Sequence, residues 1–123
     1  MRELPAGATV GYFRTCKLTA RTRVATICAG YTDGLPLALS NRGRVLVNGV
    51  SCPILGRLSM DYTTVDVSAV PGEIGWGTPV TLWGEEGKEC IEIEEWARLK
   101  NTHAHDILCA LGTRVERIYT ETR

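Results

Sequence analysis

The chain has 123 residues, of which 44% are hydrophobic and 23% are charged, and its 14 basic and 14 acidic residues give a formal net charge of zero. This length fits one domain with its own core, and the balanced charge gives no reason to expect nucleic acid or anionic lipid as a partner. The sequence has neither a bilayer-spanning apolar run nor the apolar stretch of a signal peptide after MRELPAGATV, so we expect a cytoplasmic protein, or a cytoplasmic domain if a membrane segment lies upstream.

Short apolar runs bounded by Gly, Pro, Asn or Asp recur along the chain, as in all-β proteins. They predict strands at 9–14, 23–29, 44–47, 50–58, 62–67, 79–83, 90–93 and 114–119. The clearest hairpin is RVLV-NG-VSCPI, because Asn48 and Gly49 can supply the two positive φ angles of a type I′ turn. A second hairpin is expected to turn at residues 85–88.

Between the last two predicted strands the pattern becomes helical. IEEWARLKN, residues 93–101, spaces its apolar side chains as a helix does and ends on Asn101, a candidate C-cap. Thr102 is a candidate cap for a second short helix that runs to Leu111. The sequence therefore predicts a mainly β fold, a small closed β-structure with a short helical insert before its last strand.

Both histidines lie in THAHDILC, where His103 and His105 precede Asp106. On a helix these histidines would point about 200° apart, and on a strand Asp106 would point away from both, so a shared metal is disfavoured. A metal site needs three or four convergent ligands. We therefore expect no metal site and interpret the histidines as solvated or helix-end residues.

The local sequence alone indicates a catalytic role for no other residue. Tyr12 in VGYFRT is typical of packing in a strand, and Arg57 and Asp61 in GRLSMD are typical of a turn or surface. No serine-nucleophile turn and no phosphate-binding glycine loop occurs in the sequence. The five cysteines are scattered and never form CxxC, which predicts reduced, mostly buried thiols and not disulfides or a zinc framework.

Four segments, in this order, resemble the C-terminal domain of alanine racemase, a fold-type III pyridoxal-phosphate enzyme. They are RELPAGATVGYFRT, RVATICAGYTDGLPLALSNRGRVLVNG, CPILGRLSMDYTTVDV and THAHDILCALGTRVERIY, and they are spread over essentially the whole length of the chain. The resemblance implies that residues 1–123 form a closed Greek-key β-barrel. In the family this domain follows an α/β barrel that carries the cofactor lysine; that barrel is absent here, and none of Lys17, Lys88 and Lys100 matches the lysine.

The resemblance also implies a function, the conversion of L-alanine to D-alanine for peptidoglycan with pyridoxal 5′-phosphate as cofactor. Racemisation removes the α-carbon proton from one face and returns it to the other, which requires two bases. Tyr12 matches the tyrosine base, which enters the partner subunit's site in a homodimer. We therefore expect this domain to act with the N-terminal barrel of the same enzyme and to be inactive alone.

Other matched positions have implied roles around a small amino-acid substrate. Tyr31 matches a residue of the substrate entryway, and Arg57 and Asp61 match polar residues of the entry corridor. Met60 matches a residue whose backbone N–H meets the substrate carboxylate. His105 replaces a tyrosine that bonds the cofactor phosphate, and an imidazole can also donate such a bond.

Three further positions depart from the family pattern. Phe13 replaces a usual glycine, Cys16 replaces a tyrosine, and Leu37 replaces an arginine. Because the position of His105 lies beside the substrate side chain, that departure leaves the choice between alanine and serine open.

Other functions stay open at this point. One is a membrane-bound serine racemase of the glycopeptide-resistance type, and another is a non-catalytic β-barrel interaction module with an exposed apolar face. A decarboxylase of the same fold type is disfavoured by GYTDG and GRLSMD.

Overall fold

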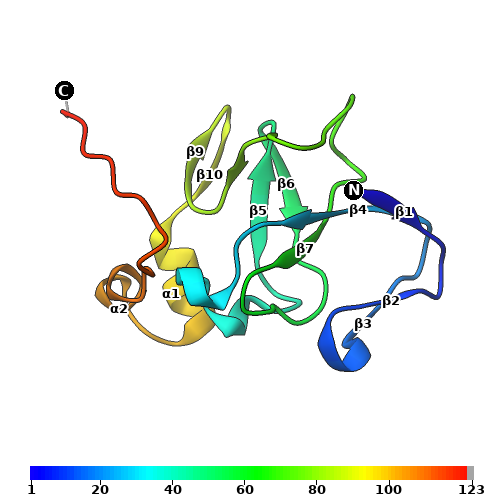
Figure 1. The fold of residues 1–123 in the computed structure, drawn as a ribbon, viewed down its shortest axis with the longest axis horizontal. Helices are drawn as coiled ribbons and strands as arrows, with labels where there is room; N and C mark the ends of the chain where they lie inside the picture. The colour runs from blue at the N-terminus through cyan, green and yellow to red at the C-terminus, as the bar shows by residue number, and fades with distance from the viewer. Residues whose placement is uncertain (122–123) are drawn as a thin grey trace.

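The structure is a computed structural model that describes residues 1–121, apart from the side chain of Tyr12. Short antiparallel strands make up most of the regular structure, and two short α-helices lie together at one end, away from the N-terminal strands (Figure 1). This mainly β architecture with a helical insert near the C-terminus confirms the predicted class. None of the helices in the described part has the length and apolar character needed to cross a membrane.

The strands form four antiparallel sheets. The first two sheets have the strand orders β1 (Arg2–Leu4), β4 (Thr22–Ile27), β7 (Thr63–Asp66), and β6 (Val50–Pro53), β5 (Arg44–Val47), β8 (Val80–Thr81). The other two are the hairpins β2 (Thr9–Val10) with β3 (Cys16–Lys17), and β9 (Gly84–Glu86) with β10 (Glu89–Ile91). The helical elements are the 3₁₀ turns η1 (Tyr12–Arg14), η2 (Tyr31–Asp33) and η3 (Leu37–Leu39), and the α-helices α1 (Ile93–Lys100) and α2 (Ala104–Cys109).

The local turn and cap signals are confirmed. Asn48 and Gly49 have φ angles of 49° and 75° between paired strands β5 and β6, as a type I′ turn requires. The second hairpin turns between β9 and β10, as expected. Helix α1 ends on Asn101, whose left-handed φ of 60° lets its N–H bond carbonyls of the last turn.

Helix α2 is shorter than predicted and is preceded by His103 in the N-cap position, not by Thr102. The side chain of His103 forms no capping hydrogen bond with the helix. The helix pair therefore exists as predicted, with a different start for its second member.

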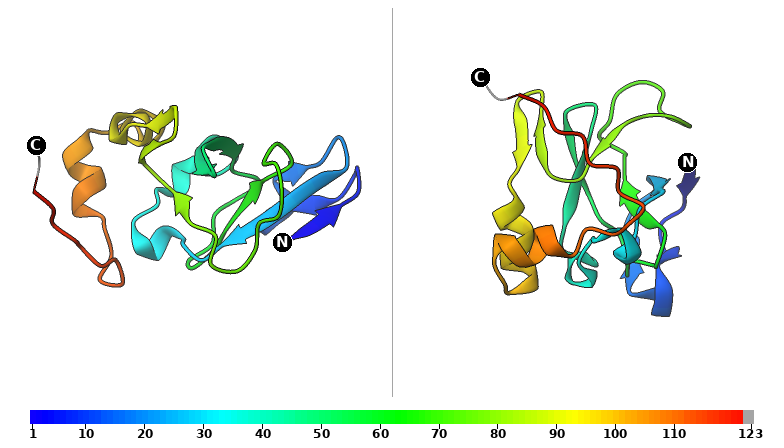
Figure 2. Two further views of the ribbon diagram at one scale, coloured as in Figure 1. Left: turned by 90° about the horizontal axis from the view of Figure 1, so that it is seen from above. Right: turned by 60° about the vertical axis from the view of Figure 1, so that its left-hand side comes forward.

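Two of the strands predicted from the sequence, at 9–14 and 114–119, are wrong. Only Thr9 and Val10 of segment 9–14 pair, because Gly11 and Phe13 have positive φ angles and the chain leaves the sheet in η1. Segment 114–119 forms no strand, and Figure 2 shows the red C-terminal part of the chain as a coil that runs on from the second helix.

The described strands also do not close into a barrel. The two three-stranded sheets meet at the isolated bridge between Ile54 and Val65. Strand β6 ends at Pro53, but the N–H of Ile54 still donates to Gly43 and that of Leu55 to Thr64, before Gly56 turns the chain with a φ of 75°. The expected strand at 50–58 is thus shorter than predicted.

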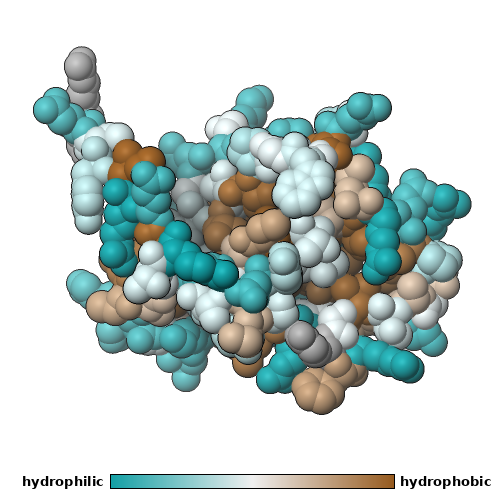
Figure 3. Space-filling view, in the orientation of Figure 1, coloured by the Kyte–Doolittle hydropathy of each residue, from teal (hydrophilic) through white to brown (hydrophobic). Residues whose placement is uncertain are grey.

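A single apolar core lies between the sheets and α1. Trp96 of α1 is buried and packs edge-on against Trp83, with ring centroids 6.5 Å apart. The fully buried side chains around it include Leu39, Val45, Leu46, Val65, Ile91 and Ile107. Apolar surface also remains visible between the polar groups on the face drawn in Figure 3.

The cysteines are all free, as predicted, but they are not mostly buried. Cys52 lies in the core, where burial raises the pKa of its thiol, whereas Cys28, Cys90 and Cys109 are exposed.

Turn η3 offers a matched test of the core. We expect Leu39→Ala to lower the free energy of unfolding by about 2–5 kcal/mol, because Leu39 is fully buried. Leu37→Ala, on a side chain that is 41% exposed in the same turn, should cost less than about 1 kcal/mol. Urea unfolding followed by circular dichroism measures both, and equal losses would contradict this placement of the core.

Candidate functional site

The turn that carries Tyr12 lies directly against the segment that carries Arg57. A Cβ atom added to Gly11 would lie 2.6 Å from the backbone nitrogen of Arg57, and one added to Gly56 would lie 2.5 Å from the carbonyl oxygen of Val10. Both glycines also have positive φ angles, 83° and 75°. Because only glycine tolerates both conditions, VGYFRT and GRLSMD are held backbone to backbone.

Asn41 fastens this contact from the side. Its side-chain oxygen accepts a 2.7 Å bond from the N–H of Gly56, and its own N–H donates to the Gly56 carbonyl at 3.1 Å. Its side-chain amide also donates to the carbonyl of Thr15, just after η1. Sequence reasoning missed Asn41, because its partners lie far away in the chain.

The GYTDG segment is joined to the same wall. Gly30 packs against the carbonyls of Ser59 and Met60, with no room for a Cβ atom. The N–H groups of Tyr31 and Thr32 donate to those two carbonyls at 3.1 and 3.0 Å. Tyr31 and Met60 are therefore placed side by side through their backbones, and their side chains are 44% and 53% exposed.

Arg114 joins the C-terminal segment to these loops. Its guanidinium donates to both carboxylate oxygens of Asp33 at 2.9 Å and lies 2.8 Å from Asp61 and from the hydroxyl of Thr32. Gly112 packs on the Thr32 carbonyl, and its N–H donates to the carbonyl of Asp33. Asp61, predicted from the resemblance as a corridor residue, is thus held by a residue that the sequence had placed in a strand.

The charges of this cluster reinforce one another. Burial alone would raise the pKa of Asp33, but the N–H of Gly30 and the Arg114 guanidinium outweigh it and lower that pKa. The hydrogen bond and charge of Asp33, with those of Asp61, in turn raise the pKa of Arg114. Both partners therefore stay charged around neutral pH.

Arg57 has a different kind of partner. Its guanidinium carbon lies 5.5 Å from the centre of the Phe13 ring, which is 84% exposed. Arg57 forms no ion pair or side-chain hydrogen bond with any described residue. The side chain of Tyr12, the candidate base between Gly11 and Phe13, lies outside the described part of the structure.

His105 lies apart from these side chains. It is exposed in α2, and its ring centroid is 6.0 Å from that of His103. The other end of this helix approaches the loops, because Gly34 packs against the carbonyl of Ala110. Among residues 1–121, no group of three or more His, Cys, Asp or Glu side chains is placed so that it could hold a metal ion.

The lysines lie elsewhere too. Lys17 on β3 and Lys88 in the β9–β10 turn are exposed, and Lys100 pairs with Asp106 at 2.8 Å. The Lys100 hydrogen bond and charge lower the pKa of Asp106.

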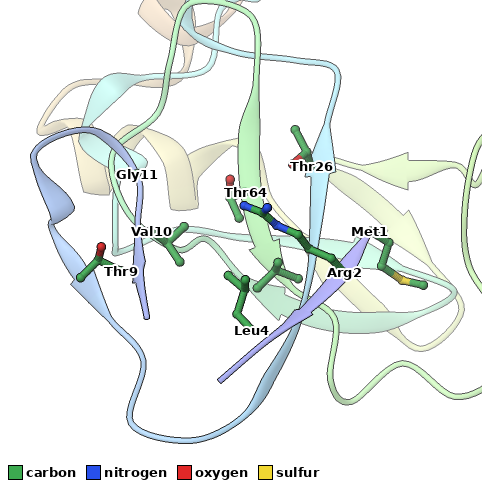
Figure 4. Close-up of a pocket in the computed structure, with 9 residues that line it drawn as sticks. Met1, Arg2, Leu4, Thr9, Val10, Gly11, Thr26 and Thr64 are labelled. Atoms are coloured by element: carbon green, nitrogen blue, oxygen red, sulfur yellow. The ribbon is translucent and has the colours of Figure 1, made fainter. Parts of the chain in front are cut away.

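Two cavities adjoin the candidate residues without enclosing them. One of about 240 Å³ lies beside Gly11, where Arg2, Leu4 and Val10 converge (Figure 4). The other, of about 710 Å³, separates Trp83 and Trp96 from the C-terminal segment. Tyr31, Arg57 and Met60 line neither of these two cavities, and the side chains of Tyr31 and Met60 are exposed to solvent.

Residues 1–119 match the family model described as the alanine racemase C-terminal domain. The chain belongs to that family. The sequence is 46% identical over 119 residues to a catabolic alanine racemase of Rhizobium johnstonii, covering 96% of this chain and 30% of the relative. It is 43% identical over 112 residues to an alanine racemase of Syntrophobacter fumaroxidans, covering 91% and 30%.

Solved structures agree. Alanine racemase from Bartonella henselae with covalently bound pyridoxal phosphate has a TM-score of 0.87 and 38% identity, covering 97% of this chain and 32% of that one. Biosynthetic alanine racemase from Pseudomonas aeruginosa has a TM-score of 0.85 and 36% identity, covering 98% and 32%. The chain thus spans about 30% of the length of these relatives, and none of them supports the serine racemase, decarboxylase or interaction-module alternatives.

The glycine contact can be tested against a glycine with the same backbone angle. Gly7 has a φ of 88° and open space around it, so Gly7→Ala should cost only the strain of about 1 kcal/mol. Gly11→Ala should lower the free energy of unfolding by a further ~1–3 kcal/mol, because its Cβ meets backbone. Equal urea midpoints for the two variants would rule out the close contact.

The Arg114 cluster predicts a pH-dependent effect. The pKa of Asp33 is lower in the folded than in the unfolded chain, so the stabilisation is complete above about pH 4 and is lost as pH falls through the folded value. We expect Arg114→Met to lower the thermal midpoint at pH 7 by a few degrees and this difference to shrink towards pH 3. Arg117→Met, on an exposed arginine, is the control, and a difference independent of pH would contradict the ion pair.

Proposed function

We propose that this chain is the C-terminal domain of a pyridoxal-phosphate-dependent alanine racemase that interconverts L-alanine and D-alanine. The observation that carries the proposal is the convergence of VGYFRT, GYTDG and GRLSMD through backbone contacts that admit only glycine at Gly11, Gly30 and Gly56. The alanine racemases that match nearly the whole chain support it. D-alanine for peptidoglycan is the expected product, made in the cytoplasm.

Tyr12 is the proposed base of this domain. Its phenol oxygen would accept the α-carbon proton on one face of the substrate, or return it there, in the site of a partner subunit. A phenol titrates near pH ~10, so this role needs a cation to favour the phenolate.

Met60 and its neighbours are proposed to bind and orient the amino acid. No described residue accepts a hydrogen bond from the Met60 N–H, which leaves this donor for a substrate carboxylate. Tyr31 would line the entryway beside it, and Arg57 and Asp61 would form the polar corridor. Arg114 neutralises part of the negative charge of Asp61 and fixes its position.

The cofactor, when bound, supplies an electron sink for the charge that develops at the α-carbon. His105 is the residue of this chain proposed to hold its phosphate, since the imidazole is exposed and bonds no described residue. The three lysines do not suit the covalent anchor, because Lys100 is paired and the others lie on β3 and the β9–β10 turn. The anchor and most of the site would come from the N-terminal α/β barrel, so we expect the chain alone to be inactive.

The closed Greek-key barrel belongs to the same proposal. Segment 114–119 lies extended and outside the sheets, although Arg114 at its start is tied to Asp33 and Asp61. In the homodimer that we propose, this segment would supply the closing strand.

A chimera tests the function. We would replace the C-terminal domain of the Rhizobium johnstonii alanine racemase with this chain and expect alanine racemisation. Tyr12→Phe should lower kcat by at least about 100-fold without loss of cofactor absorbance, because a proton-transfer group is removed. Tyr119→Phe, on an exposed tyrosine, should not change kcat.

Two outcomes would overturn parts of this proposal. A folded chimera that holds the cofactor but does not racemise alanine would remove the proposed activity. An active chimera that is unaffected by Tyr12→Phe would remove Tyr12 as the base.

A further inference from the structure

Phe13 combines two features that do not favour a stable fold. Its backbone has a φ of 61° and a ψ of 15°, a left-handed conformation that is a rare outlier for a bulky residue. Its side chain is 84% exposed, so burial in this chain does not offset that strain. Strained residues of this kind cluster at functional sites.

The ring of Phe13 has a defined contact, the guanidinium of Arg57 at 5.5 Å. The backbone contact between Gly11 and Gly56 brings the two residues within reach of each other. The acid four residues further on, Asp61, pairs with Arg114 at 2.8 Å and forms no ion pair with Arg57. Among the described residues, the Phe13 ring is the side-chain partner of the Arg57 guanidinium.

An aromatic partner leaves Arg57 in a different state from an acidic one. The ring face attracts a cation through its quadrupole but carries no net charge, so it orients the guanidinium without neutralising it. A carboxylate would both orient and neutralise the guanidinium. Arg57 is thus held in place with its full positive charge.

We propose that Phe13 is a positioning residue that holds the Arg57 guanidinium at the mouth of the site, where it attracts the carboxylate of the incoming amino acid. This inference rests on the proposed racemase function. It assigns to the residue that replaces the usual glycine a role in substrate capture and none in the chemical step.

The contact itself is tested on the 123-residue chain, without any activity. Ring current from Phe13 should displace the side-chain proton resonances of Arg57 in the NMR spectrum. The displacement should be lost in Phe13→Leu, which keeps an apolar side chain, and kept in Phe13→Tyr, which keeps the aromatic face. Arg57 resonances that are the same in all three proteins would overturn the inference whether or not the chain is part of a racemase.

The role in capture is tested by kinetics in the chimera described above. Phe13→Leu should raise the KM for alanine about two- to five-fold, the value of one exposed cation–π contact, with kcat within about two-fold. Phe13→Tyr should restore the KM. In an Arg57→Met background, Phe13→Leu should add no further increase, because the two residues act as one unit.

The possible failures are distinct. An active chimera in which Phe13→Leu leaves KM unchanged, or raises it equally without Arg57, would overturn the role of Phe13 alone. A chimera with no activity in its unsubstituted form would overturn the proposed function, and the role of Phe13 in capture with it.

Discussion

The close contact between Gly11 and Gly56 is the constraint on which the arrangement of this domain depends. Each glycine occupies a position where a Cβ atom would overlap the backbone of the other segment. The distance between the two segments is therefore set by main-chain atoms, which, unlike side chains, have no alternative rotamers. Gly30 packs against Met60 in the same way, and so does Gly112 against Thr32. Four segments that are distant in the sequence therefore meet at distances that side-chain repacking cannot alter.

The two arginines at these contacts, Arg114 and Arg57, have different kinds of partner. Arg114 takes both carboxylates, Asp33 and Asp61, and becomes part of the scaffold. Arg57 is left with the neutral face of Phe13 and keeps its charge for an external anion.

Sequence reasoning succeeded where the structural cause is local. The Asn48-Gly49 turn and the Asn101 cap follow from φ preferences of single residues, and both are found. It failed where the cause is remote: Arg114 lies 81 residues from Asp33, and nothing near either residue marks the pair. The predicted strands at 9–14 and 114–119 had suitable side chains, but a strand needs a partner ladder, and apolar content does not reveal one. The candidate site residues came from the family resemblance, since Tyr12 and Met60 have no local pattern that distinguishes them.

The exposure of the candidate residues is best understood from what this chain holds and what it lacks. It holds the turn with Tyr12, the N–H of Met60 and the charged residues Arg57 and Asp61, on segments that backbone contacts hold together. No lysine here suits the cofactor anchor, and Tyr31, Met60 and Phe13 remain open to solvent. A proton-transfer group works only where water is excluded and its partner base faces it from the other side. In the proposed enzyme the glycine contacts would therefore act before assembly, by presenting an ordered half-site whose geometry the partner subunit completes.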